Sequence, residues 1–245
     1  MQIEGKRVLV TGASRGLGRT LAFAFANAGA RQVLAGTRRK EDEETLKAEA
    51  AKLSVNVTPV HLDIRSETDV NAVAALGGVD ILVNNAGVAG YGNPITMDFN
   101  SIQDEIDVNY LGTLRMVRAV APAMIEKQEG AIVNIATAFA KINLPLIGTY
   151  CATKAALLSL GQALRAYLSP DGIFVMTVLP TTIDTDMSRG AEVPKMGTEF
   201  VAGEILQAIR DEKHDPPIGD EAHRVIEGVA KDAIGFEKML SEYRA

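Results

Sequence analysis

The sequence has 245 residues but only one cysteine, three histidines and no tryptophan. The single cysteine, Cys151, cannot form a disulfide bond within the chain, which is typical of a reducing compartment, so we expect a cytoplasmic protein. So few histidine and cysteine side chains form no cluster with the spacing of a metal site, and we expect no metal. The formal net charge of -6 disfavours a nucleic-acid partner, because nucleic-acid-binding surfaces are basic.

Long hydrophobic runs and signal segments are also missing. No uninterrupted apolar run approaches the roughly 18 residues of a membrane span, and residues 1–6 lack the basic-then-apolar layout of a secretory signal. We therefore expect no membrane partner. Apolar residues make up 47% of the sequence and charged residues 23%, as in ordinary soluble globular proteins. The length suits one large α/β unit without a visible linker, so we predict a single domain over residues 1–245.

A glycine-rich turn follows the first apolar run of the chain. Residues 7–11 predict a strand, Gly12, Gly16 and Gly18 lie in the turn, and residues 20–28 have the alanine-rich pattern of a helix. Such a turn brings backbone N–H groups and the positive end of a helix against a diphosphate. We expect a dinucleotide site here. The alternative is a glycine-rich turn that holds no ligand.

Apolar runs and helical patterns alternate along the rest of the chain. This alternation predicts an α/β fold, a doubly wound parallel sheet of Rossmann type with about seven strands and ligands at the strand carboxyl ends. Ser66 is expected to cap a helix with Leu76 in its buried stripe. Further strands are predicted near residues 32–36, 57–62, 81–83, 131–135, 173–179 and 217–219. Further helices are predicted at 40–52, 99–126, 201–209 and 222–243, the last broken at Gly228 and Gly235.

Tyr150 and Lys154 are four residues apart in a stretch of strong helix formers, so they should share one helical face. An ammonium about 5 Å from a phenol favours the phenolate, so we expect Lys154 to lower the tyrosine pKa from its ordinary value of about 10. A phenol tuned in this way can act as an acid or a base. The alternative is that both side chains lie on a solvated helix face.

Three motifs occur in an order and at approximate spacings that resemble the classical short-chain dehydrogenases/reductases. They are Thr11-Gly12-x-x-x-Gly16-x-Gly18, Asn84-Asn85-Ala86-Gly87 and Tyr150-x-x-x-Lys154. The chain length also matches that family. The resemblance implies that Tyr150 and Lys154 are catalytic, together with Asn109 and Thr137. Asn109 would sit at a helix distortion and hold a water that connects the lysine to solvent.

The sequence departs from the family pattern at two positions. Thr137 stands where the family normally has a serine, which preserves a hydroxyl but narrows the pocket. Thr181 stands where a glycine usually follows the proline at the end of the sixth strand. These departures bear on rate and substrate size more than on the type of reaction.

The resemblance also implies which residues contact the cofactor. Asp63 would bind the adenine amino group, Ile64 would pack near the ring, and Ile183 and Thr185 would anchor the carboxamide. For Asn84 we expect a structural role, in which its side chain cross-links neighbouring strands. The expected cofactor-binding residues are Gly12, Ser14, Arg15, Gly16, Leu17, Gly18, Thr37, Arg38, Asp63, Ile64, Asn85, Ala86, Gly87, Tyr150, Lys154, Pro180, Ile183 and Thr185.

The end of the second strand indicates which dinucleotide is preferred. NAD-binding folds usually have an acidic residue about 20 positions beyond the glycines, whereas Thr37 lies here and Arg38 follows it. Arg15, inside the glycine turn, resembles the basic residue of NADP-preferring members of the family. Charge-assisted bonds contribute roughly 1.5 to 3 kcal/mol each, so we predict NADP(H). The alternative is that Arg38 and the next residue, Arg39, are solvated loop charges, and this alternative stays open for Arg39.

The resemblance implies an NADP(H)-dependent oxidoreductase that interconverts a ketone or aldehyde and an alcohol, with residues 186–200 as a substrate lid. It also implies a homodimer or homotetramer. Two alternatives are a catalytically silent NADP-binding sensor or scaffold and a 3-oxoacyl-carrier-protein reductase. A sugar-nucleotide epimerase is disfavoured, because only about a quarter of the chain follows Thr185 and such enzymes need a larger substrate region.

Overall fold

A computed structural model describes residues 1–244, and Ala245 lies outside the described part. The chain forms a sheet of seven strands in the order β3-β2-β1-β4-β5-β6-β7. Every neighbouring pair of strands is parallel, which confirms the predicted doubly wound fold. The strands are β1 (Arg7–Val10), β2 (Gln32–Thr37), β3 (Val57–His61), β4 (Ile81–Asn84), β5 (Gly130–Ile135), β6 (Ile173–Pro180) and β7 (Pro217–Ile218).

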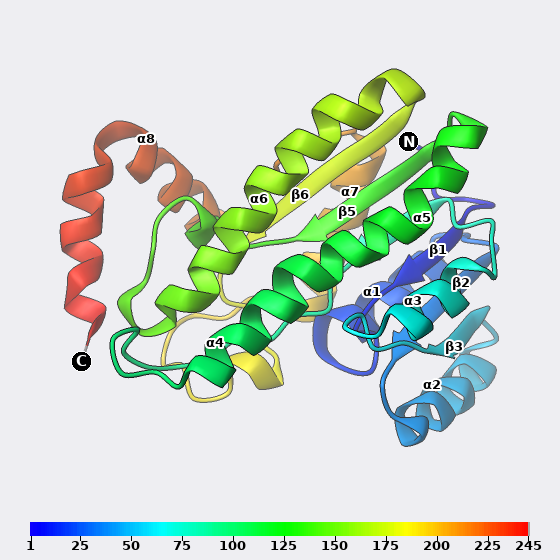
Figure 1. Cartoon of the computed structure of the whole chain (residues 1–245), viewed down its shortest axis with the longest axis horizontal. Coiled ribbons are helices and arrows are strands. Elements are labelled where there is room, and N and C mark those ends of the chain that lie inside the picture. Colours follow the sequence, from blue (N-terminus) through cyan, green and yellow to red (C-terminus); the bar gives the residue numbers. More distant parts are fainter. Residues whose placement is uncertain (245) are drawn as a thin grey trace.

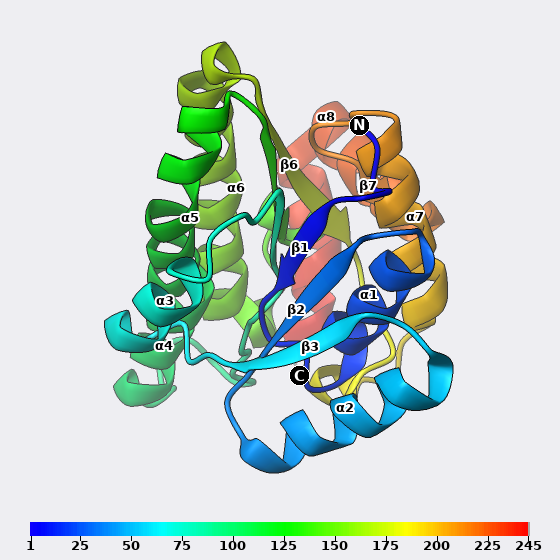
Figure 2. The same ribbon diagram turned by 90° about the vertical axis from the view of Figure 1, so that its right-hand side faces the viewer.

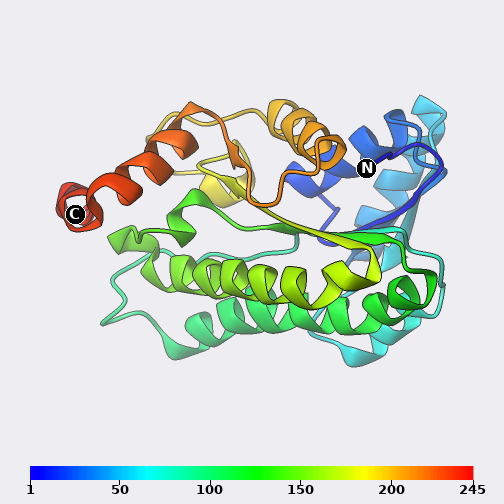
Figure 3. The same ribbon diagram turned by 90° about the horizontal axis from the view of Figure 1, so that it is seen from above.

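Helices cover both faces of the sheet. Figure 2 shows α3, α5 and α6 on one side of the strands and α1 and α7 on the other, and the view from above in Figure 3 shows the same two layers. The α-helices are α1 (Gly16–Asn27), α2 (Lys40–Leu53), α3 (Glu67–Ala74), α4 (Phe99–Ile106), α5 (Thr113–Lys127), α6 (Gly148–Leu168), α7 (Thr198–Arg210) and α8 (Asp220–Leu240). The short helical turns are η1 (Asp107–Gly112), η2 (Ala138–Ala140), η3 (Pro145–Ile147), η4 (Ser169–Asp171), η5 (Asp186–Ser188) and η6 (Ser241–Arg244).

The core lies in two apolar layers, one on each face of the sheet. Because side chains alternate across a strand, Val8 and Val10 of β1 pack with α1 and α7, whereas Leu9 packs on the opposite side with α3 and α5. Both faces are covered, so the central strands consist mainly of apolar residues instead of alternating with polar ones. This packing fixes the strands as a rigid platform and leaves their carboxyl ends for binding.

The strand order places a crevice between β1 and β4. The chain moves outward from β1 to β2 and β3, then returns to β4 on the other side of β1. The connections after β1 and β4 therefore diverge at the carboxyl ends of these strands, which is where open α/β sheets bind ligands. The glycine turn after β1 and the segment at 84–87 after β4 both lie at this point.

The long helix predicted at 99–126 is three elements in the structure. The α4 and α5 helices are separated by the π-helical turn η1, which contains Asn109. The α3 helix is capped by Ser66, whose hydroxyl accepts from the Asp69 backbone N–H as predicted. Leu76 is 48% exposed, however, because α3 ends at Ala74 and the chain has left the helical face by then.

The C-terminal helix differs from its prediction. The α8 helix continues through Gly228 and Gly235 and is kinked at Asp232, whose backbone is extended. The Asp232 carboxylate accepts from the Gly235 backbone N–H at 2.9 Å, so it caps a new helical turn. Figure 1 shows α8 at the end of the molecule away from α2. Within residues 1–244, no helix combines the length and apolarity needed to cross a membrane.

Candidate active site

At two of its glycines, the turn after β1 packs so closely against its neighbours that a side chain would not fit. Gly12 has a φ of +64°, and a Cβ at this position would lie 2.8 Å from the Cα of Ala86. A Cβ on Gly18 would lie 2.3 Å from both the Gly12 carbonyl oxygen and the Asn85 Nδ2. The helix α1 begins at Gly16, and its N-cap residue Arg15 makes no side-chain capping bond to the described chain. The backbone N–H groups at this helix end are thus open to an anion.

The segment after β4 is bonded directly to this turn. The Thr11 hydroxyl accepts from the backbone N–H groups of Asn85 and Ala86, both at 3.0 Å. The Asn85 amide donates to the carbonyl of Thr11 at 2.9 Å. The Asn84 amide instead donates to the Asn134 side chain at 2.9 Å, across β4 and β5, as its structural reading predicted. Residues 84–87 therefore hold the two sides of the crevice together.

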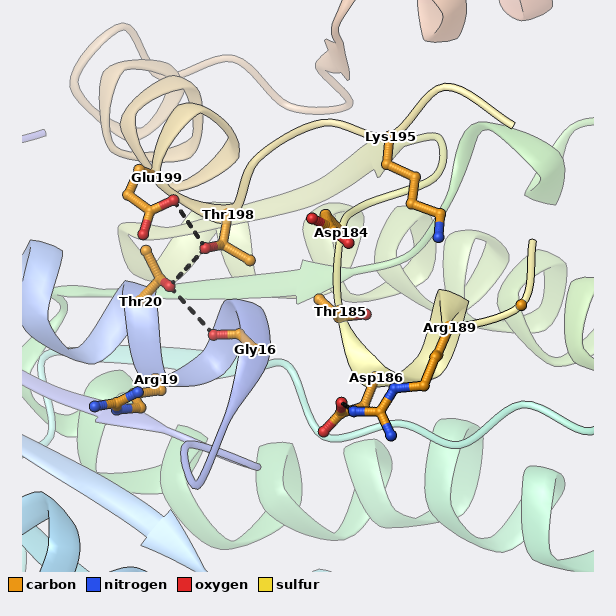
Figure 4. Close-up of a pocket in the computed structure, with 11 residues that line it drawn as sticks. Gly16, Arg19, Thr20, Asp184, Thr185, Asp186, Arg189, Lys195, Thr198 and Glu199 are labelled. Atoms are coloured by element: carbon orange, nitrogen blue, oxygen red, sulfur yellow. Dashed lines mark hydrogen bonds and ion pairs between the residues drawn. The ribbon is translucent and has the colours of Figure 1, made fainter. Parts of the chain in front are cut away.

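A polar cavity of about 520 Å³ extends from the glycine turn towards α7 (Figure 4). Gly16 and Thr185 meet in it, since a Cβ on Gly16 would lie 3.1 Å from the Thr185 Cγ2. The hydroxyl of Thr20 on α1 donates to that of Thr198 on α7 at 2.9 Å and ties the two helices. The residues that line the cavity are Gly16, Arg19, Thr20, Asp184, Thr185, Asp186, Arg189, Gly190, Lys195, Thr198 and Glu199.

Arg15 pairs with Asp186, one of the residues that line this cavity. Its guanidinium lies 3.1 Å from a carboxylate oxygen of Asp186, which also pairs with Arg189. Both charges of the Arg15 pair are substantially exposed, so the pair contributes little stability. In this arrangement the glycine turn is linked to η5, and Arg15 would have to leave Asp186 to bind a phosphate.

The end of β2 holds a buried hydroxyl that can bind a ligand. Thr37 is buried, and its Oγ1 has no hydrogen-bond partner within the described residues. Arg38 next to it is exposed. Arg39 forms two bonds to Asp42, at 2.9 and 3.0 Å, which fits the expectation that it is a surface charge. An orphaned buried hydroxyl beside an exposed arginine fits the edge of a phosphorylated ribose.

At the end of β3 the two predicted residues are already engaged by the protein. The Asp63 carboxylate accepts from Arg65 in several bonds, including one of 2.9 Å, and these bonds hold the pKa of that carboxyl below its usual range. Arg65 also reaches Asp104 at 3.0 Å. Ile64 is buried and packs closely against Gly112. Because Arg65 makes four bonds to the two Asp63 oxygens and a carboxylate offers about four acceptor sites, an adenine amino group would have to replace one of these bonds.

The proposed catalytic pair lies on the inner side of α6. The Lys154 Nζ is 5.6 Å from the centre of the Tyr150 ring, so the two side chains share one face as predicted. Lys154 is only 4% exposed and donates to the Ile135 carbonyl at 2.8 Å. A Cβ on Gly87 would lie 3.5 Å from this Nζ, which places the lysine beside the segment after β4.

The electrostatics of this pair differ from the prediction. Burial raises the pKa of Tyr150 above its ordinary value, with smaller contributions from Cys151 and Glu105. Burial also lowers the pKa of Lys154 to about 8. The predicted lowering of the tyrosine pKa by Lys154 is therefore wrong for this arrangement. The ammonium donates to Ile135 and is itself desolvated, so loss of hydration decides the proton affinity of the phenol.

Asn109 lies in the π-helical turn η1, so the structure has the helix distortion that the family resemblance implied. Its amide makes three bonds: Oδ1 accepts from the Val88 N–H, and Nδ2 donates to the Val88 carbonyl and to the Thr153 hydroxyl, each at 2.9 Å. Thr153 belongs to α6, one residue before Lys154. Asn109 thus joins the segment after β4 to the helix of the catalytic pair.

Thr137 lies after β5, and its hydroxyl is bonded within the protein. It donates to the Pro180 carbonyl at 3.0 Å and accepts from the Phe139 backbone N–H at 3.3 Å. These bonds connect the ends of β5 and β6. Beyond Pro180, Ile183 forms an isolated parallel bridge with Met196, which closes residues 184–195 into a loop at the site.

The predicted residues omit one side chain that the structure brings into the site. Glu105 lies on α4 one turn before Asn109, is 1% exposed, and accepts from the Gly90 N–H at 2.6 Å. Its other carboxylate oxygen has no hydrogen-bond partner in the described part of the chain. A glutamate four residues before Asn109 falls on the same helical face, and this spacing could have identified Glu105 as a site residue from the sequence.

The parallel sheet, the glycine turn and the crevice at the strand ends define a Rossmann-type dinucleotide-binding protein. The family described as short chain dehydrogenase matches residues 6–194. A short chain dehydrogenase from Burkholderia cenocepacia J2315, solved in complex with NADP, has a TM-score of 0.91 and 35% identity, covering 98% of this chain and 99% of that one.

Relatives compared by sequence agree with the structural neighbour. A dehydrogenase/reductase SDR family protein 7-like from Anopheles gambiae is 34% identical over 237 residues, or 86% of this chain and 74% of that protein. A D-erythrulose reductase from Gallus gallus is 37% identical over 191 residues, or 77% and 76% of the two chains. The chain belongs to the short-chain dehydrogenase/reductase family, an oxidoreductase family.

Proposed function

We propose that this protein is an NADP(H)-dependent oxidoreductase that interconverts a ketone or aldehyde and an alcohol. The observation that carries the proposal is the Tyr150–Lys154 pair, held on one face of α6 with the lysine beside Gly87 at the crevice. The complex of the Burkholderia cenocepacia relative with NADP and the name of the D-erythrulose reductase support the cofactor and the reaction class.

The residues present fit a nicotinamide dinucleotide. The glycine turn and the open end of α1 would hold the diphosphate, and Thr37 with Arg38 would hold the ribose and its 2′-phosphate. Ile183 and Thr185 would hold the carboxamide from the far side of the cavity. When bound, this group supplies or accepts the hydride.

Tyr150 would donate the proton to the alkoxide that forms from the carbonyl. A phenol whose pKa is raised by burial keeps its proton at neutral pH, and an alkoxide is basic enough to take it. Lys154 places a positive charge on the same side of the helix, and Asn109 holds the adjoining segment in register with α6. In the oxidative direction Tyr150 would accept the proton.

Thr137 would orient the substrate oxygen with its hydroxyl. That hydroxyl now donates to Pro180, so it must turn its hydrogen away to bind a carbonyl oxygen, whereas its remaining lone pair can accept from the hydroxyl of an alcohol. The extra methyl group limits the available rotamers, which favours substrates that are narrow at the reacting carbon.

Three broader features belong to the same proposal. Residues 186–200 form the lid, and this rests on their position along the cavity, which several of them line, up to the first residues of α7. Assembly into a homodimer or homotetramer rests on the family resemblance. A cytoplasmic location rests on the single cysteine in the sequence.

A panel of ketones and aldehydes tests the proposal, with oxidation of NADPH and of NADH followed by absorbance. We expect several members of the panel to be reduced with NADPH, and at a higher kcat/KM than with NADH. A panel that includes small polyol ketones covers the chemistry of the D-erythrulose reductase relative. Better turnover with NADH throughout would overturn the assignment of the cofactor, and no turnover with either would overturn the reaction.

A further inference from the structure

Glu105 is a charged side chain buried in the wall of the active site. It is 1% exposed, although a carboxylate in an apolar interior is costly unless it is well paired. One oxygen accepts a bond of 2.6 Å from the Gly90 N–H, and the other finds no partner among residues 1–244. A buried carboxylate with one unpartnered oxygen needs an explanation beyond packing.

The position of Glu105 continues the set of bonds made by Asn109. Asn109 bonds both backbone groups of Val88, and Glu105, one helical turn earlier, bonds the N–H of Gly90. The two side chains therefore hold alternate residues of the extended segment that leaves β4. This segment passes from Gly87, beside Lys154, to the start of α4.

The surroundings connect Glu105 to the catalytic helix. A Cβ on Gly90 would lie 3.2 Å from the Glu105 Oε1 and 3.1 Å from the Met97 Cε, so Met97 borders the carboxylate. The Thr149 hydroxyl, next to Tyr150, contacts the Met97 sulfur at 3.3 Å. Burial is the main cause of the raised pKa of both Tyr150 and Cys151, and the negative charge of Glu105 adds a smaller contribution in the same direction.

The titratable side chains that act on the phenol of Tyr150 come from two elements. Lys154 and Cys151 lie on its own helix, and Glu105 lies on α4. Apolar side chains from two further parts of the chain pack in the same cluster as the Tyr150 ring. From the segment after β5 these are Ala138, Phe139, Ile142, Leu144 and Ile147, and from α8 they are Ala222, Val225, Ile226 and Phe236.

We propose that Glu105 is a positioning residue that fixes the segment at Gly90 and sets a negative charge near the phenol of Tyr150, which holds the phenol in its protonated form. In the reductive direction this charge opposes formation of a phenolate before the alkoxide is there to take the proton. In the oxidative direction it makes the phenol a base only at higher pH. The inference rests on the proposed function, because it concerns the same proton transfer.

Glu105→Gln separates the two roles, since its amide oxygen can still accept from Gly90 while the charge is gone. Glu105→Leu removes both. Glu126→Gln is the matched control, because it makes the same change of side chain and removes a negative charge from an exposed position of α5. The readouts are the pH profile of kcat/KM for alcohol oxidation with NADP⁺, and amide hydrogen exchange of the segment that contains Gly90.

We expect Glu105→Gln to move the rise of the oxidation profile to lower pH with unchanged exchange at Gly90. Glu105→Leu should move the profile and also speed the exchange, and Glu126→Gln should change neither. A Glu105→Gln profile that superimposes on that of the natural protein overturns the proposal. If Glu105→Leu does not fold, the glutamine variant alone still decides the charge effect.

A second measurement does not depend on turnover. The ultraviolet absorbance of phenolate in the NADP⁺ complex, minus that of a Tyr150→Phe variant, reports the titration of Tyr150 alone. The proposal predicts a several-fold larger phenolate fraction in Glu105→Gln at a given alkaline pH. An equal fraction contradicts the role of Glu105, whereas loss of turnover with an altered titration contradicts only the proposed reaction.

Discussion

The proton on Tyr150 is controlled by residues that do not react. Lys154 donates to the Ile135 carbonyl, so its charge is partly satisfied by the backbone and is not directed at the phenol alone. Burial then raises the pKa of Tyr150 and lowers that of Lys154 to about 8. Spacing along a helix predicts that two side chains are neighbours, but only the folded surroundings determine how strongly each one is desolvated.

Arg38 and Arg39 form a natural pair for testing the choice of cofactor. Arg38 is exposed beside the orphaned hydroxyl of Thr37, whereas Arg39 is already bonded twice to Asp42. We expect Arg38→Ala to raise the Kd for NADPH by roughly tenfold or more, because one charge-assisted bond is lost, and to leave NADH nearly unchanged. Fluorescence titration of both cofactors measures this.

Arg39→Ala is the control for that titration and should change neither Kd by more than about twofold, as for other exposed ion pairs. Equal losses for NADPH and NADH in Arg38→Ala would contradict the assignment of the 2′-phosphate to this arginine. Arg15 is the less direct test, since it must first leave Asp186.

At the scale of single residues, the sequence predicted where side chains lie better than it predicted the pKa of Tyr150. The three motifs placed Asn85, Tyr150 and Lys154 in one crevice, because motif order along a parallel sheet fixes which strand ends meet. Glu105 was missed, because an acidic residue in an amphipathic helix usually faces solvent. Its burial depends on the contact between α4 and the segment at Gly90, which no local pattern encodes.

Among the elements, the glycine turn and the start of the helix α1 restrict most strictly which residue types fit. A Cβ on Gly18 would lie 2.3 Å from the Gly12 carbonyl oxygen, so Gly18→Ala must displace the backbone of the turn. We expect a loss of about 1–3 kcal/mol of unfolding free energy, which lowers Tm by about 2–4 °C for each kcal/mol. Weaker NADPH binding should accompany it, and calorimetry with a binding titration measures both.

Gly203→Ala provides the matched control for this substitution. Gly203 lies inside α7, and a Cβ there would meet no atom of the described chain within 4 Å. Alanine in place of an exposed helical glycine should stabilise the protein by about 0.5–1 kcal/mol without altering NADPH binding. Similar stability for the two variants would show that the turn is looser than its contacts indicate.

One helix interruption was predicted at the right place and another was not. The resemblance implied a distortion at Asn109, and η1 has it. The C-terminal break was placed at Gly228 and Gly235 from glycine propensity, yet it lies at Asp232, where the carboxylate supplies a new cap. Glycine only permits a break, whereas a capping side chain replaces the lost backbone bonds.

For the whole molecule, the order of the strands explains why distant motifs form one site. The glycine turn, the segment after β4 and the loops after β5 and β6 all leave the same edge of the sheet. The fold could be predicted from the alternation of apolar runs and helical patterns, because each strand is buried on both faces. The polar cavity against α7 could not, because it depends on how residues 184–190 fold back over the glycine turn.

The most direct test of the account is to compare Tyr150→Phe with the natural protein for NADPH-dependent carbonyl reduction and for NADPH affinity. The substitution removes one hydroxyl from a half-buried ring and leaves the packing of α6 intact. We predict that kcat/KM falls by roughly 10²–10⁴-fold, the usual contribution of a general acid, while the Kd for NADPH stays within about twofold. Retained turnover, or loss of turnover and cofactor binding together, would contradict the claim that the phenol of Tyr150 transfers the proton.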